Sequence, residues 1–307
     1  MKNKKAELTT QQLVTMVILI VSFVVILFLL FRLNLGKETE KELCYNSVVL
    51  RAGSVLPKDS IPLDCHRSYI CITKDGSCET MTKPEVKKVK TDVEVYQVLA
   101  DEMAECWWMF GEGKVDYVGK DFFYKDNYCS ICSQIVFDDS LRDISSFSSG
   151  TLDKNKFYSY LANENYTVGK TYSEYLFKTN NLDLLKQELS KNQSTEVTFG
   201  TIDFSNQYFV VTGITSEVAG KGWKYVAGGV VTVAGIFIPG VGWTWAGAIV
   251  GAIIISAGEY GALQNPEIIA IPVEGQGINN QFMAPTIVEA NSEKFKALNC
   301  QEILTKA

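Results

Sequence analysis

Two long runs of apolar residues dominate the pattern of hydrophobic and polar positions along the chain. The first extends from Leu13 to Phe31 without a charged residue and contains only two hydroxyl side chains. A helix of these nineteen residues is about 28 Å long, close to the ~30 Å hydrocarbon core of a bilayer. Arg32 follows the run, in place of the small residues of a cleavage site. The pattern therefore predicts an uncleaved transmembrane signal-anchor over residues 13–33.

The charges around this anchor give little information on its orientation. Three basic residues lie within 1–12 and three within 32–43, and the α-amino group adds a positive charge on the N-terminal side. We expect a single-pass protein of the cell membrane. In this topology residues 1–12 form a cytoplasmic tail, 34–43 a juxtamembrane linker and 44–307 an extracytoplasmic domain. A second interpretation is a pilin-like precursor that is processed near Ala6.

The second apolar run extends from Tyr225 to Gly258, and Pro239-Gly240 divides it near its middle. As one continuous helix it would be about 51 Å long, too long for a bilayer, and it would separate Cys300 from the other cysteines. We therefore predict a Gly/Ala-rich helical hairpin over residues 222–263. Small residues at helical spacing let two helix backbones approach closely. The glycines predicted to serve this packing are Gly228, Gly235, Gly247, Gly251 and Gly258.

The composition of this hairpin resembles that of the glycine-zipper hairpins of bacteriocins and other membrane-inserting peptides. That resemblance implies membrane lipid as a partner of residues 225–258, in addition to the N-terminal helix. A hairpin that only packs on its own domain is the competing interpretation. Strand-like segments at 207–215 and 268–273 flank the hairpin, and its closed ends would bring them next to each other in one sheet.

Shorter patterns predict the other elements. The predicted strands are 47–51, 68–73, 196–204 and 207–215, the last two forming a hairpin, and the predicted helices are 91–110 and 182–192. Because strands and helices follow one another without a βαβ rhythm, we predict an α+β fold with a mostly antiparallel sheet. A capping box at Thr91 and Glu94 begins the helix over 91–110.

Two groups of side chains in this region have both a functional and a structural interpretation. Asp101, Glu102 and Glu105 could act as paired catalytic carboxylates, but on an amphipathic helix they fit the solvated face better. An aromatic-rich strip could bind a partner, but core packing over disulfides is the commoner role. Its residues are Trp107, Trp108, Phe122, Phe123, Tyr124 and Tyr128.

Charge and composition exclude several classes of protein. The chain has 29 Lys and Arg against 35 Asp and Glu, a net charge of −6. Because nucleic-acid-binding proteins normally present a basic surface to phosphate, nucleic acid is not an expected partner. A single histidine excludes sites built from several imidazoles. The chain contains no phosphate loop, dinucleotide fingerprint, nucleophile elbow, zincin or EF-hand sequence, so we expect no metal and no cofactor.

The cysteines carry the clearest chemical information. All of them lie beyond the predicted anchor: Cys44, Cys65, Cys71, Cys78, Cys106, Cys129, Cys132 and Cys300. An even set on one side of a membrane is typical of disulfides in an oxidising compartment. Eight cysteines allow 105 pairings, so the connectivity stays open. A turn signal at Asp75-Gly76 favours a bond between Cys71 and Cys78.

The pair Cys129 and Cys132 has three interpretations. A redox dithiol needs a lowered thiol pKa at a helix start, and no thioredoxin-like pattern surrounds the motif. A zinc site would need Cys106 and a fourth ligand, and His66 is far away in sequence. The interpretation we favour is structural, with each cysteine bonded to a different partner. Asn165 and Asn192 also match the N-glycosylation acceptor, which agrees with an outside location.

Four segments resemble a known set of proteins: residues 6–34, 42–44, 106–114 and 129–132. They look like uncharacterised, membrane-anchored, cysteine-containing surface proteins of small-genome archaea. This resemblance implies a location and a layout, an anchor followed by a surface domain. It implies no activity and therefore no catalytic residue.

Three functions are consistent with these features. We favour a membrane-anchored surface protein that acts in binding, adhesion or assembly through a disulfide-stabilised domain, with a protein or envelope component as its partner. This chain fits a non-enzyme better than an enzyme. The second function is an extracytoplasmic thiol–disulfide oxidoreductase that uses Cys129 and Cys132. The third is a membrane-inserting protein that uses the glycine-rich hairpin.

Overall fold

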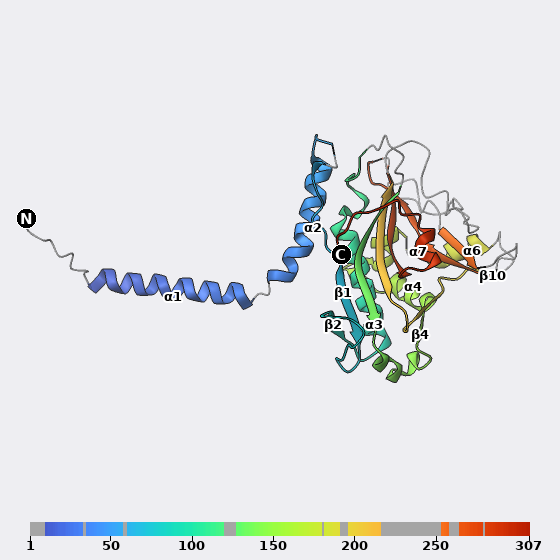
Figure 1. Cartoon of the computed structure of the whole chain (residues 1–307), viewed down its shortest axis with the longest axis horizontal. Helices are drawn as coiled ribbons and strands as arrows, with labels where there is room; N and C mark the ends of the chain where they lie inside the picture. The colour runs from blue at the N-terminus through green and yellow to red at the C-terminus, as the bar shows by residue number, and fades with distance from the viewer. Residues whose placement is uncertain are drawn as a thin grey trace, which may run out of the picture. The chain divides into compact units, whose positions relative to one another are not determined.

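The computed structural model describes residues 10–32, 35–57, 60–119, 127–179, 181–190, 196–215, 253–257, 264–278 and 280–307. The chain divides into two compact units, with the boundary between Glu42 and Leu43. The predicted division into a tail, an anchor, a linker and an extracytoplasmic domain that begins at residue 44 stays a prediction. Helices, strands and irregular segments of the second unit are drawn in Figure 1.

Helix α1, Thr10–Arg32, lies in the first unit and covers the predicted anchor. Its described side chains, residues 14–26 and Phe28, are exposed and almost all apolar. Among the residues that the structure describes, no helix is both long enough and apolar enough to cross a membrane. The signal-anchor over 13–33 therefore stays a prediction.

Helix α2, Leu35–Gly53, replaces two predicted features. The segment 47–51 is helical and not a strand, and the predicted linker 34–43 continues into the same helix. Cys44 and Val48, four residues apart, are 2% and 0% exposed and therefore form a buried helical face. The four-residue spacing of Cys44 and Val48 lets the helix bury one face against the main core. This burial outweighs the strand preference of the β-branched pair Val48-Val49.

A seven-stranded sheet forms the centre of the second unit, in the order β11-β12-β8-β3-β1-β2, with β13 also paired to β3. Its strands are β1 (Ser68–Thr73), β2 (Glu85–Lys88), β3 (Asn127–Phe137), β8 (Tyr208–Thr215), β11 (Pro272–Glu274), β12 (Gln281–Glu289) and β13 (Glu302–Ile303). The predicted strand 68–73 is confirmed. Strands β3 and β8 are buried along nearly their whole length, as expected for the middle of a covered sheet.

The α+β class and the predominance of antiparallel pairing are confirmed. Among the described strands, six of the nine pairings are antiparallel. The central sheet itself is mixed, because β1 pairs in parallel with both β2 and β3, and β13 pairs in parallel with β3. The inference that the chain lacks a βαβ rhythm is wrong. Helix α3, Asp92–Met109, connects the parallel strands β2 and β3.

Helix α3 confirms the predicted helix over 91–110. The Thr91 side chain accepts a hydrogen bond from the Glu94 backbone, while the Glu94 carboxylate accepts one from the Lys90 backbone. The predicted solvated face is wrong in part. Glu102 is only 5% exposed, because other elements of the domain cover this side of the helix as well. Asp101 is half-buried and accepts a hydrogen bond from Tyr172.

Three small two-stranded sheets lie beside the central one. They pair β4 (Thr151–Asp153) with β7 (Thr201–Asp203), β5 (Asn165–Thr167) with β6 (Lys170–Thr171), and β9 (Ile253–Ala257) with β10 (Gln264–Ala270). The predicted hairpin of 196–204 with 207–215 is wrong, since β7 pairs with β4. Strand β8 has no free edge for β7, because β3 and β12 occupy both of its edges.

The predicted helical hairpin over 222–263 lies largely outside the described residues. Where it is described, at 253–257, the chain forms strand β9 and not a helix. The run Ile253-Ile254-Ile255 is β-branched and pairs with β10, which overrides the expected helical pattern. The flanking strands do not become neighbours, since β12 lies between β8 and β11.

Four further α-helices and three 3₁₀ turns complete the described part of the second unit. They are α4 (Lys154–Asn163), α5 (Tyr172–Phe177), α6 (Leu182–Ser190), α7 (Glu293–Ala297), η2 (Gly111–Gly113), η3 (Asp139–Asp143) and η4 (Ser145–Phe147). Helix α6 confirms the predicted helix over 182–192. Helices α3, α4 and α5 contribute to the main core, whereas α7 contributes to a smaller second core with residues of β3, β8, β10 and β12. Figure 1 shows α3 alongside the strands of the sheet.

Candidate functional site

The cysteine framework is complete within the described residues, which include every cysteine of the chain. No cysteine is free. The four disulfides are Cys44–Cys65, Cys71–Cys78, Cys106–Cys132 and Cys129–Cys300. The expected bond between Cys71 and Cys78 is confirmed, and the other three join segments that are far apart in sequence or in different elements.

The two cysteines of the Cys129-x-x-Cys132 motif have different partners, as the structural interpretation predicts. The register of β3 against β8 shifts between Ile131 and Ser133, at a bulge. Cys132 belongs to the main core, where it is bonded to Cys106 of α3. Cys129 belongs to the second core and is bonded to Cys300. The disulfide between Cys129 and Cys132 that a redox mechanism requires is not formed.

The other predicted ligand arrangements are not assembled in the described part of the chain. No group of three or more His, Cys, Asp or Glu residues there could hold a metal ion. His66 is exposed, and its Nε2 lies 3.4 Å from the carboxylate of Asp64. His66 is therefore a surface side chain with a neighbouring carboxylate.

The remaining predicted residues divide between core, surface and undescribed segments. Trp107 and Tyr128 are buried in the main core, and Trp108 stacks on Tyr45 at 4.6 Å between ring centroids. Asn165 is exposed on β5. Outside the described residues lie Asn192, Phe122, Phe123, Tyr124, Gly228, Gly235, Gly247, Gly251 and Gly258.

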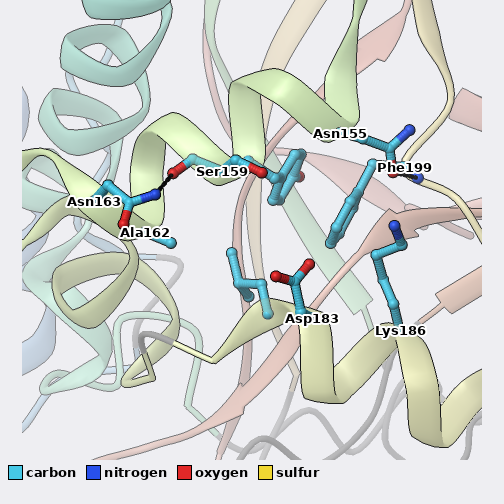
Figure 2. Close-up of a pocket in the computed structure, with 9 residues that line it drawn as sticks. Asn155, Ser159, Ala162, Asn163, Asp183, Lys186 and Phe199 are labelled. Carbon is cyan, nitrogen blue, oxygen red and sulfur yellow. Dashed lines mark hydrogen bonds between the residues drawn. The ribbon is translucent and has the colours of Figure 1, made fainter.

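One pocket lies between helices α4 and α6 and has a volume of about 260 Å³. Its lining residues are Asn155, Tyr158, Ser159, Ala162, Asn163, Leu182, Asp183, Lys186 and Phe199. Figure 2 shows the side chains of α4 on one side and those of α6 on the other. The volume is smaller than the roughly 300–1,000 Å³ of pockets for drug-sized ligands, so it fits a small molecule.

A polar stripe on α4 forms one wall of this pocket. Asn155, Ser159 and Asn163 follow one another at intervals of four residues, which places them on one face of the helix. The Asn163 side-chain amide donates a 2.8 Å hydrogen bond to the Ser159 backbone carbonyl. Within the described chain, the Ser159 hydroxyl makes no hydrogen bond. The wall therefore presents both donors and acceptors to the pocket.

The start of α4 is fixed by its N-cap and by the segment that carries Phe199. The Asp153 carboxylate accepts hydrogen bonds from the Asn155 backbone and side chain, which caps the helix. The Asn155 side-chain oxygen in turn accepts a hydrogen bond from the Phe199 backbone at 3.3 Å. These bonds hold the aromatic base of the pocket in place. The Tyr158 and Phe199 rings stack with their centroids 3.9 Å apart.

Helix α6 supplies the charged wall. Asp183 is exposed in its first turn, where a carboxylate interacts favourably with the helix dipole. Lys186, one turn later, lies 3.8 Å from the Glu196 carboxylate. Figure 2 shows both side chains directed from α6 toward the pocket. The pocket lining itself thus carries one negative and one positive side chain.

A buried lysine lies at the first residue of α4, next to this region. Lys154 is 5% exposed, and its ammonium donates a hydrogen bond to the Ile287 backbone carbonyl at 3.0 Å. Burial lowers the pKa of Lys154 to about 8. Its side chain points to β12 and does not line the pocket.

Sequence reasoning missed the pocket entirely. The only local signal is the spacing of Asn155, Ser159 and Asn163, and it has meaning only once residues 154–163 are known to be helical. Asp183 and Lys186 lie in a predicted helix, but nothing in the sequence brings that helix to α4.

The chain was also compared with known proteins. It matches no known protein family, no curated protein and no solved structure. The resemblance to membrane-anchored surface proteins of small-genome archaea therefore stays a prediction.

Proposed function

We propose that this chain is a membrane-anchored surface protein whose disulfide-stabilised domain binds a component outside the cell. The single observation that carries the proposal is the complete pairing of the cysteines. Four disulfides join all eight cysteines, and every cysteine lies after the apolar segment. Disulfides of this kind persist in oxidising compartments and are rare in the cytosol.

Helix α1 supports the membrane part of the proposal. Its described side chains between Val14 and Phe28 are apolar apart from Thr15 and Ser22, and the large ones are at least half exposed. In water such a surface is unfavourable by roughly 25 cal/mol for each Å² of apolar area. A lipid environment removes that cost. The anchor would hold residues 1–12 in the cytoplasm and the second unit outside.

The pocket between α4 and α6 supports the binding part. It combines an aromatic base with polar side chains from two helices, as small-molecule sites commonly do. Within the described chain the Ser159 hydroxyl makes no hydrogen bond to a base, so binding fits the chemistry of this pocket better than catalysis. The oxidoreductase and the membrane-inserting hairpin have no supporting contact in the described residues.

Sidedness is the decisive test. Intact cells that produce the full chain with a tag at either end are treated with external protease. We expect the tag after Ala307 to be digested and the tag before Met1 to be protected. Protection of the C-terminal tag would overturn the proposal. In parallel, the unreduced, denatured protein is treated with a maleimide, and we expect no labelled cysteine before reduction.

A further inference from the structure

The pocket between α4 and α6 has the features of a site for one ring of a neutral, polyhydroxylated ligand. We propose that it binds a neutral sugar residue. This inference rests on the proposed function, since it names the class of ligand that the surface domain would take. The hydrogen-bonding capacity, the charge and the shape of the lining favour this class of ligand.

The pocket lining has hydrogen-bonding capacity that the protein does not use. Within the described chain, the Ser159 hydroxyl and the Asp183 carboxylate make no hydrogen bond or ion pair, and the Asn163 side-chain oxygen accepts none. The carboxylate and the amide oxygen are acceptors, whereas the hydroxyl can both donate and accept. A sugar hydroxyl also donates and accepts, so vicinal hydroxyls match this mixture. These three side chains are exposed to water, and a purely apolar ligand would displace that water without replacing its hydrogen bonds, which is costly.

The charges of the lining favour a neutral ligand. Asp183 and Lys186 contribute one negative and one positive charge to the lining, so its own charges cancel. A strongly anionic ligand would meet the Asp183 carboxylate, and a cationic ligand would meet the Lys186 ammonium. An amino acid could in principle pair with both. Its carboxylate, however, would compete with Glu196, which lies 3.8 Å from the Lys186 ammonium.

The shape of the pocket suits a single ring. The base of the pocket contains the Tyr158 and Phe199 rings together with Leu182. Both rings are nearly fully buried, and the Tyr158 ring stacks on Phe199 and on Phe177, so a ligand meets the edge of Tyr158. An apolar base under a polar rim suits the C–H face of a sugar ring with hydroxyls around it. The volume of about 260 Å³ accommodates a single ring and excludes a large aromatic ligand.

The test is ligand binding by the full chain in lipid nanodiscs, measured by saturation-transfer NMR. The neutral probes are glucose, galactose, mannose and N-acetylglucosamine, and the charged probes are glucuronate and serine. We expect at least one neutral probe to bind saturably, with a Kd of about 1 mM, and the charged probes to bind at least tenfold more weakly.

Three variants assign the binding to this pocket. Asp183→Ala removes a charged acceptor, and we expect it to weaken binding about tenfold or more. Ser159→Phe places an aromatic ring in the pocket from an exposed position, and we expect it to abolish binding. Asp143→Ala is the matched control, because Asp143 is an exposed carboxylate on a different element, η3. It should leave the affinity unchanged.

Three outcomes would overturn the proposal. The first is that no neutral probe binds, and the second is that the charged probes bind more tightly than the neutral ones. The third is neutral binding that Ser159→Phe leaves intact, since the site would then lie elsewhere. Unchanged circular dichroism of each variant shows that the fold is kept. The protease test of sidedness is independent, so the ligand class can fail while the proposed function stands.

Discussion

The hydroxyl of Tyr175 donates a 2.6 Å hydrogen bond to the carboxylate of Glu112, whose backbone is left-handed with a φ of 56°. Burial raises the pKa of Tyr175, and the bond to Glu112 raises it further. Burial alone would also raise the pKa of Glu112, but hydrogen bonds from Lys114 and Tyr175 outweigh it and lower that pKa. This contact ties the η2 turn to α5.

Removal of the Tyr175 hydroxyl should therefore destabilise the domain. We expect Tyr175→Phe to lower the free energy of unfolding by about 1–2 kcal/mol, because the half-buried Glu112 carboxylate loses a donor. Urea unfolding monitored by tryptophan fluorescence measures the change. The control is Tyr45→Phe, whose ring stacks on Trp108 and whose hydroxyl makes no hydrogen bond within the described chain. Equal losses in both variants would contradict the expectation.

Glycine is required at position 113 for two reasons. The residue has a φ of 72°, and a Cβ there would lie 3.1 Å from the buried ring of Trp107. Gly113→Ala should cost about 2–4 kcal/mol, from the left-handed backbone and from overpacking. Gly169 has a φ of 77° with nothing within 4 Å, so Gly169→Ala should cost only about 1–2 kcal/mol. Thermal unfolding of both variants isolates the contribution of packing. A smaller loss of stability in Gly113→Ala than in Gly169→Ala would contradict this expectation.

The disulfides should differ in their contributions to stability. The bond Cys129–Cys300 spans 171 residues, whereas Cys71–Cys78 spans seven. From loop entropy, replacing both cysteines by serine should cost about 5 kcal/mol for the long loop and about 2 kcal/mol for the short one. Chemical denaturation of the two double variants gives the comparison. A larger loss for the short loop would show that unfolded-state entropy is not the main term.

Stability should rise with pH above neutrality and fall again at high pH. The pKa of Lys154 is lowered to about 8 by burial, while in the unfolded chain it is about 10.4. Between these values the unfolded state binds more protons, so stability increases by up to about 1.4 kcal/mol per pH unit. Burial raises the pKa of Tyr158 and Tyr208 to about 12. Above pH 10 the unfolded chain loses these protons first, and stability declines.

A pair of lysine variants tests the source of this rise. Lys154→Met should reduce the slope of unfolding free energy against pH between 8 and 10. Lys156→Met changes an exposed lysine on the same helix and should leave the slope as it is. The measurement is urea unfolding at a series of pH values. If both variants give the slope of the unchanged chain, burial of Lys154 is not its cause. Burial also lowers the pKa of Lys178 to about 8. Lys178 therefore accounts for part of the slope that remains in Lys154→Met.

The elements that sequence reasoning predicted well are those with local signals. Helix α3 has its own N-cap at Thr91, and the turn at Asp75-Gly76 brings Cys71 and Cys78 together. The errors arise where distant contacts decide. Segment 47–51 has strand-forming residues, yet burial of Cys44 and Val48 makes it helical. Likewise, β7 is excluded from β8 only because two remote strands occupy its edges.

The candidate pocket could not be predicted from the sequence for the same reason. Its walls come from α4 and α6, and its base includes Phe199, which follows α6 by several residues. The residues that face it carry no motif, since Asn, Ser, Asp and Lys are common on helix surfaces. Only the packing of α4 against α6 brings these residues together in one pocket.

The bond between Cys129 and Cys300 has a consequence for biosynthesis. Cys129 is synthesised 171 residues before its partner, a delay of roughly 10–30 s at ordinary rates of translation. During that interval its thiol stands next to Cys132 and can enter a premature bond. Maturation therefore needs either protection of that sulfur or a catalyst that reshuffles mistakes. Strand β13 and the β-bridge between Lys306 and His66 involve residues that follow Cys300, so these contacts also form after that interval.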